Sequence, residues 1–157
     1  MVVEQVMPQV VVERSMRNVA VDRVWSIARR LTDYPMFMDQ VVSVEPCAMP
    51  HVINATSWIV LLNGNELRWI EQDEYDDANR RMTFQQIEGD LAEWAGSFET
   101  AVVDGQVLAR YDVTFDLGVP ALADVLHPLG EIAIRSNCRQ MLEELERQSR
   151  LVPQANE

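Results

Sequence analysis

The stretch PALADVLHPLGEIAIRSNCRQMLEELERQS, residues 120–149, decides the fold of this chain. Its apolar residues recur at intervals of three and four, which is the spacing of one face of an α-helix. They are Leu122, Val125, Leu126, Leu129, Ile132, Ala133, Cys138, Met141, Leu142 and Leu145. Pro128 and Gly130 interrupt this face and predict a kink or a restart of the helix. A long amphipathic helix must bury its apolar face against another layer of structure.

The residues before this helix supply that layer. Six segments between residues 41 and 117 show the alternation of β-strands and are separated by turn-forming residues. They are residues 41–47, 53–62, 66–75, 80–88, 93–103 and 106–117. Asn63-Gly64-Asn65 and Asp104-Gly105 are typical of tight hairpin turns. Because turns this short join antiparallel neighbours, we expect one antiparallel sheet.

One strand and two short helices precede these segments. Residues 10–16 alternate, residues 20–31 repeat apolar side chains at helical spacing, and residues 33–38 predict a second short helix. This α+β order predicts the helix-grip fold, a curved antiparallel sheet of about seven strands around the long C-terminal helix, with a cavity between them. We expect a single domain over residues 1–157, with a disordered tail from about residue 150.

Composition and charge exclude several classes of function. The chain has 25 acidic and 13 basic residues, none of them lysine, and a net charge of −12. Without lysine it cannot form a lysine Schiff base or hold pyridoxal phosphate covalently, and its net charge repels nucleic acid. Its cysteines and histidines form no metal-binding pattern, so we expect neither a metal nor another cofactor.

The sequence also predicts where the protein resides. No apolar run approaches the roughly 20 residues that span a bilayer. The N-terminus carries an acid, Glu4, where a signal peptide carries a basic residue. We therefore expect a cytoplasmic protein without a membrane span.

Six short stretches and one further residue, spread over nearly the whole chain, carry a resemblance to a known family. They are VW at 24–25, LTDYPMF at 31–37, LRW at 67–69, RRMTF at 80–84, GD at 89–90, FDLGVP at 115–120, and Asn137. Together they resemble the polyketide cyclase/aromatase branch of the START-like (SRPBCC, Bet v 1-like) superfamily. The same set is shared with quinone- and lipid-binding relatives that catalyse nothing.

The resemblance implies a function. It implies a cavity that binds a poly-β-ketone, tethered to an acyl carrier protein, and directs its aldol cyclisation and dehydration to an aromatic ring. Holding a flexible chain in one reactive geometry supplies part of the selectivity. An enzyme of this kind, a polyketide cyclase/dehydratase, is the favoured interpretation. The alternatives are a non-catalytic carrier of a quinone or lipid, and an assembly partner with an incidental cavity. A homodimer is left open.

A carrier protein is acidic, so the net charge of this chain would repel it, and docking would need a local cluster of arginines. The candidates are Arg14, Arg17, Arg29, Arg30, Arg80 and Arg81.

The sequence departs from the family at several cavity positions. Glu71 and Asp73 align where family members carry a small hydroxyl residue and an arginine. Val41 aligns with a tyrosine, and Val113 with a polar residue, whereas Asn137 is kept. Such a cavity lacks the cationic group that would stabilise a developing enolate. The family's chemistry therefore does not transfer intact.

Three residues are the catalytic candidates. Alternation places Trp69, Glu71 and Asp73 on one face of the strand 66–75, so both acids face the cavity if Trp69 does. Inside it, desolvation and mutual repulsion would raise the pKa of at least one acid and make it a general acid or base. The competing interpretation places both at a solvated rim, because unpaired acids are rarely buried. Tyr111 is the third candidate, as a hydrogen-bond donor to a ketone oxygen.

The ligand-binding candidates are mostly aromatic. They are Tyr34, Trp69, Trp94, Phe98, Phe115, Asn137 and Met141. For each aromatic residue, ordinary core packing competes with a place in the cavity wall. For Asn137, a hydrogen bond to a strand-edge carbonyl and a ligand contact both satisfy the buried amide.

Overall fold

The computed structural model describes residues 7–118 and 123–151. Its elements are β1 (Gln9–Met16), α1 (Val21–Ala28), the 3-10 helix η1 (Leu31–Met36), β2 (Val41–Met49), β3 (Val52–Leu62), β4 (Asn65–Asp76), β5 (Arg81–Gly89), β6 (Glu93–Val103), β7 (Gln106–Asp116) and α2 (Ala123–Arg150). The seven strands form one sheet in the order β1-β7-β6-β5-β4-β3-β2, and every neighbouring pair is antiparallel.

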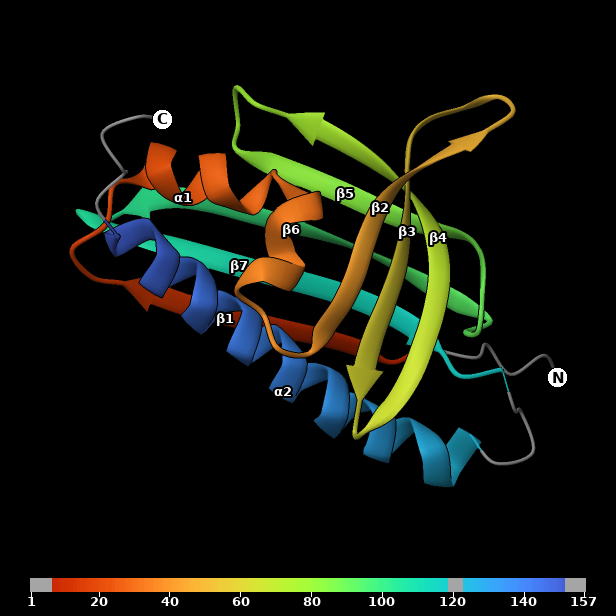
Figure 1. Ribbon diagram of the computed structural model, residues 1–157. Helices are drawn as coiled ribbons and strands as arrows, with labels where there is room; N and C mark the ends of the chain where they lie inside the picture. The colour runs from red at the N-terminus through yellow and green to blue at the C-terminus, as the bar shows by residue number, and fades with distance from the viewer. Residues whose placement is uncertain (1–6, 119–122, 152–157) are drawn as a thin grey trace, which may run out of the picture.

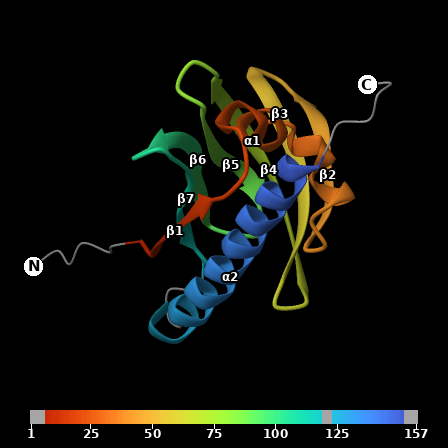
Figure 2. The same ribbon diagram turned by 90° about the vertical axis from the view of Figure 1, so that its left-hand side faces the viewer.

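The sheet curves around α2, as Figures 1 and 2 show. The helix contacts β1, β7, β3 and α1. The core between the two layers contains buried side chains from β1, α1, η1, the sheet and α2. The helix-grip fold is therefore confirmed, with both short helices after the first strand. The predicted tail lies beyond Arg150, and all but Leu151 of it falls outside the described residues.

The long helix differs from its prediction in one respect. It continues without a break from Ala123 to Arg150, so the predicted restart is wrong. Pro128 lies near the beginning of α2, where its missing N–H removes a single hydrogen bond. Gly130 has a different purpose, because a Cβ there would lie 3.2 Å from the side chains of Phe115 and Leu117. The glycine lets α2 approach β7 closely.

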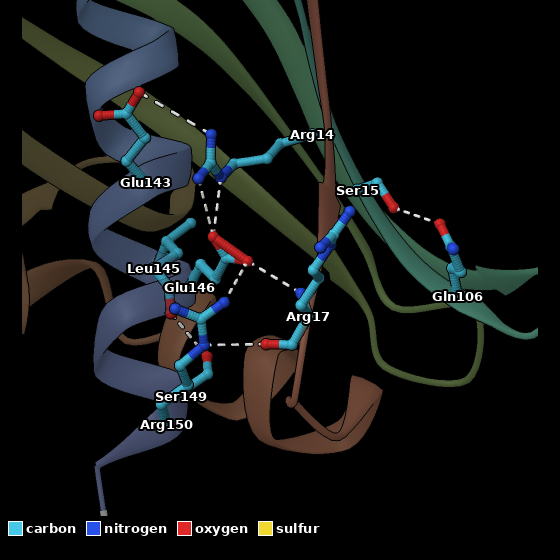
Figure 3. Close-up of polar contacts among 9 residues, drawn as sticks. All are labelled: Arg14, Ser15, Arg17, Gln106, Glu143, Leu145, Glu146, Ser149 and Arg150. Atoms are coloured by element: carbon cyan, nitrogen blue, oxygen red, sulfur yellow. Dashed lines mark hydrogen bonds and ion pairs between the residues drawn. The ribbon is translucent and has the colours of Figure 1, made fainter.

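The C-terminal half of α2 is joined to β1 through Glu146 (Figure 3). This side chain is buried and accepts hydrogen bonds from Arg14 Nε, the backbone N–H of Arg17 and Arg150 Nη2, each at 2.9 Å. Burial raises the pKa of Glu146, but the bonds from Arg17 and Arg14 and the charges of Arg14 and Arg150 outweigh it, so the pKa lies below its usual value. Glu146 is thus an ionised acid that fixes the helix on the sheet edge.

Replacing Glu146 with Ala is expected to lower the free energy of unfolding by about 2 kcal/mol, because the half-buried guanidinium of Arg14 and the backbone N–H of Arg17 lose their acceptor. Urea denaturation at neutral pH measures the change. The exposed pair of Glu144 with Arg147 is the matched control, and Glu144→Ala should change stability by less than about 1 kcal/mol. The effect of Glu146 should fade as the pH falls through its lowered pKa, since the stabilising form is the carboxylate. Equal effects of the two variants would contradict the assignment.

Candidate functional site

An internal cavity lies between α2 and the concave face of the sheet. Side chains from η1, β2 to β7 and α2 line it, with Leu91 from the β5–β6 connection, and most of them are apolar. The centres of water molecules can occupy about 70 Å³ of this cavity. That is room for about five waters at ~15 Å³ each. A ligand with several rings therefore requires side chains to move apart. The half-buried lining residues, which include Leu62, Leu67, Trp94 and Met141, mark the more open part of the wall.

Strand β4 places the two candidate acids inside this cavity. Its alternate residues Leu67, Trp69, Glu71 and Asp73 all line the wall, as the alternation predicted. Exposure falls along the strand from half-buried Leu67 to Trp69 at 7%, Glu71 at 3% and Asp73 at 2%. The interpretation that placed the acids at a solvated rim is therefore wrong.

Each acid has a neutral hydrogen-bond donor. Trp69 Nε1 donates to Glu71 Oε1 at 2.7 Å. Thr56 Oγ1 donates to Asp73 Oδ2 at 2.6 Å and itself accepts from Trp58 Nε1 at 2.8 Å. The indoles of Trp58 and Trp69, cross-strand partners on β3 and β4, stack at 5.7 Å between ring centroids. These bonds hold both carboxyl groups in fixed positions on the wall.

Burial and proximity change the ionisation of the pair. Burial raises the pKa of Glu71 well above its usual value, and the hydrogen bond and negative charge of Asp73 raise it further. Burial also raises the pKa of Asp73, although the hydrogen bonds from Glu71 and Thr56 oppose that rise. Two such groups lose their protons in coupled steps. Holding one proton, the pair presents a carboxylic acid and a carboxylate, which are a general acid and a general base.

Two buried donors in the wall meet no protein acceptor at hydrogen-bond geometry within the described residues. They are the hydroxyl of Tyr111 and the indole Nε1 of Trp94. Burial raises the pKa of Tyr111 far above its usual value, so its hydroxyl stays protonated. Tyr34 also lines the cavity, but its hydroxyl donates to the carbonyl of Ala28. Buried donors without acceptors are rare in folded proteins and favour a ligand that provides one.

A β-bulge in β5 adapts the wall beside Glu71. Ile70 pairs with Glu88 while Glu71 pairs with Gln86, so Ile87 is the extra residue. The bulge places Gln86 opposite Glu71, and Gly89 opposite Trp69. Gln86 donates to the carbonyl of Leu91 at 2.7 Å and keeps its own buried carbonyl oxygen without a partner.

The missing side chain at Gly89 makes room for Trp69. A Cβ there would lie 2.4 Å from Trp69 Cβ. Gly89→Ala is therefore expected to lower the free energy of unfolding by about 1–3 kcal/mol through overpacking and to change the near-ultraviolet circular dichroism of the tryptophans. Exposed Glu88 is the matched control on the same strand, and Glu88→Ala should leave both unchanged. A Gly89→Ala protein with native stability and spectrum would contradict this role.

The cavity brings together most of the predicted ligand-binding residues. Tyr34, Trp69, Trp94, Asn137 and Met141 line it, together with Glu71, Asp73 and Tyr111. Asn137 Nδ2 also donates to the carbonyl of Leu61 at 3.0 Å, so the strand-edge interpretation of this amide is confirmed.

Phe98 and Phe115 lie elsewhere, and their placement in the cavity wall is wrong. Both are fully buried, in the packed core. Phe98 lies between Trp25 of α1 and Tyr111, with ring centroids 6.5 Å and 5.1 Å away. Phe115 packs against His127 of α2, at 5.9 Å between ring centroids. Both face inward, but α1 and α2 cover these positions directly and leave no open space.

Sequence reasoning missed Thr56, Trp58 and Gln86. Trp58 faces Trp69 across the β3–β4 pair, and strand pairing through the Asn63-Gly64-Asn65 turn was the signal that could have found it. Within the described residues no group of His, Cys, Asp and Glu side chains could hold a metal ion. The described part of the chain also contains no helix long and apolar enough to cross a membrane.

Known structures share this fold. The chain is similar to TTHA0849 from Thermus thermophilus, with 25% identity and a TM-score of 0.80 over 90% of this chain and 97% of that one. It is similar to the Zhui aromatase/cyclase from Streptomyces sp. R1128, with 15% identity and a TM-score of 0.76 over 91% and 93%. It also resembles the di-domain ARO/CYC BexL from the BE-7585A biosynthetic pathway, with 18% identity and a TM-score of 0.69, covering 89% of this chain and 47% of that one.

The sequence comparisons complete the assignment. No curated protein matches the chain. The family model for polyketide cyclase / dehydrase and lipid transport matches residues 18–142, which is most of the chain. The helix-grip fold and the internal cavity agree with that match. The chain therefore belongs to the polyketide cyclase / dehydrase and lipid transport family.

Proposed function

We propose that the cavity binds a poly-β-ketone chain, presented on an acyl carrier protein, and directs its aldol cyclisation and dehydration to an aromatic ring. The observation that carries this proposal is the buried pair of Glu71 and Asp73, which shares the cavity with the unpartnered hydroxyl of Tyr111. Membership of the polyketide cyclase / dehydrase family supports it, as does the shared fold of the Zhui aromatase/cyclase.

The residues suggest a role for each group. The carboxylate of Asp73 removes a proton from a carbon between two ketones, and the resulting enolate attacks a second ketone to form the new carbon–carbon bond. Tyr111 donates a hydrogen bond to the attacked oxygen, where negative charge develops. Glu71 gives its proton to that oxygen. In the dehydration, an acid protonates the hydroxyl, the base removes the neighbouring proton, and water leaves.

An aromatic wall suits the flat product. Successive rings of Tyr34, Trp58, Trp69, Trp94 and Phe84 lie 5.3–6.0 Å apart between centroids. They form a continuous cluster of flat apolar side chains, and a planar aromatic ring packs favourably against such side chains. Because the cavity is small, substrate binding requires flexible residues such as Met141 to move aside.

The carrier protein's docking site stays a prediction. Arg29 pairs with Asp77, and Arg80 pairs with Asp22, so these candidates gather around α1 and the β4–β5 turn. Leu62 and Leu67, at the more open part of the cavity, flank the β3–β4 turn at the other end of β4. Arg29 and Arg80 therefore do not flank that part of the wall.

The test is to supply a carrier-bound poly-β-ketone and separate the products with and without the protein. The proposal expects the aromatised product to replace the mixture that forms spontaneously, because the cavity limits the chain to one reactive geometry. An unchanged mixture would contradict it. Tight binding with an unchanged mixture would instead identify a carrier, the alternative function.

A further inference from the structure

The four tryptophans divide into three with a hydrogen-bond acceptor and one without. Trp25 Nε1 donates to Asp77 at 2.9 Å, and the indoles of Trp58 and Trp69 donate to Thr56 and Glu71. Trp94 Nε1 is buried and unpartnered although the residue is at the more open part of the cavity. With the Tyr111 hydroxyl, the cavity thus has two donors that no protein acceptor occupies and that can donate to an acceptor oxygen of a ligand.

The charged groups of the wall are of one sign. Glu71 and Asp73 line it, and no arginine or histidine of the described residues does. A carboxylate that enters such a cavity loses its hydration, finds no cation to pair with, and lies near two acids. A ketone or ester loses far less hydration, and its carbonyl oxygen can accept from a free donor of the wall.

We infer that this cavity selects uncharged ligands that carry a carbonyl oxygen and excludes ligands that carry a carboxylate, because Trp94 and Tyr111 each offer a donor to a carbonyl oxygen and the pair of acids rejects the anion. The inference rests on the proposed function only in taking the cavity as the ligand site. It means that an acyl chain has to enter as a thioester, ester or ketone. A product released as a free carboxylate has no stable place in the cavity.

Four single-ring compounds of nearly one shape test the inference: acetophenone, benzoate, isopropylbenzene and the 1-phenylethylammonium ion. At about pH 8 and moderate salt, acetophenone is expected to bind at least about tenfold more tightly than benzoate. It should bind about threefold to tenfold more tightly than isopropylbenzene, which is the value of one net hydrogen bond. Titrations followed by ¹⁵N–¹H NMR give the affinities.

The indole signals report the contact directly. The Trp94 signal, assigned with Trp94→Phe, should move with acetophenone and much less with isopropylbenzene. The Trp25 signal is the internal control, because its N–H is already bonded to Asp77 and Trp25 is not in the cavity wall. Trp94→Phe and Tyr111→Phe should bring the affinity for acetophenone toward that for isopropylbenzene. The double variant Glu71→Gln with Asp73→Asn should reduce the difference in affinity between acetophenone and benzoate.

Three results would overturn the inference: benzoate binding as tightly as acetophenone, the ammonium ion binding most tightly, or a Trp94 signal that acetophenone does not move. Failure of all four compounds to bind would overturn it too. The product assay for cyclisation is separate. The charge preference can fail while the ring still closes selectively, and it can hold while the products stay unchanged.

Discussion

Replacing Glu71 with Gln and Asp73 with Asn together is expected to slow aldol closure and dehydration by on the order of 100-fold or more. The amides keep the shapes of the side chains and can still accept from Trp69 and Thr56. They can neither remove nor deliver a proton. The measurement is the rate of formation of the aromatised product from a carrier-bound poly-β-ketone in a single turnover, with shunt products increasing as that rate falls.

The neighbouring acid Glu74 provides the control. It belongs to the same strand but is exposed and does not line the cavity, so Glu74→Gln should leave the rate unchanged. Asp73→Asn and Glu71→Gln tested singly separate the base from the acid. Equal rates and products for the double variant and the wild type would exclude the acids from catalysis and leave the shape of the cavity as its sole contribution.

The same double variant is expected to be more stable than the wild type at alkaline pH, by about 2 kcal/mol. The pKa values of Glu71 and Asp73 are raised by burial in the folded protein. Between the ordinary and the raised values, the folded state holds more protons than the unfolded chain, so wild-type stability falls as the pH rises through this window. The amides do not titrate, so the double variant does not lose this stability as the pH rises. Below the ordinary pKa values both acids are protonated in both states, and the pH-dependent part of the gain disappears.

Urea denaturation across this pH range measures the difference. The lowered pKa of Glu146 makes its contribution to stability rise with pH, but both proteins contain Glu146, so this contribution cancels in the difference. Glu74→Gln, a change at an exposed acid outside the cavity wall, again serves as the control. A stability difference between the double variant and the wild type that does not change with pH would contradict the raised pKa values.

The fold was predictable because local signals agreed with one another. Turn residues at Asn63-Gly64-Asn65 and Asp104-Gly105 marked the ends of strands. The apolar face along residues 120–149 required a second layer of structure to bury it. The restart at Pro128 was wrong because one lost hydrogen bond near the beginning of a well-packed helix does not end it. Contact of Gly130 with Phe115 is a tertiary property that the spacing of residues along the chain does not contain.

The site was predictable only in part. Alternation placed Glu71 and Asp73 beside Trp69, but it does not tell a buried end of a strand from a solvated one. Burial of the acids depends on the donors of Trp69 and Thr56 and on the shielding that the curved sheet and η1 provide. Alternation also predicts that Phe98 and Phe115 face inward, as the cavity residues do. It cannot predict that α1 and α2 pack directly on these two rings and fill the space beside them.

The most direct test of the account is a ¹³C NMR titration of the side-chain carboxyl groups of Glu71 and Asp73, with and without acetophenone. A proton-sharing pair in the cavity should give two coupled steps, at least one well above the ordinary glutamate pKa of about 4.3, and a shift of both signals when the ketone binds. Two independent titrations near the ordinary values, unaffected by the ketone, would contradict a proton-sharing pair in the cavity and with it the proposed chemistry.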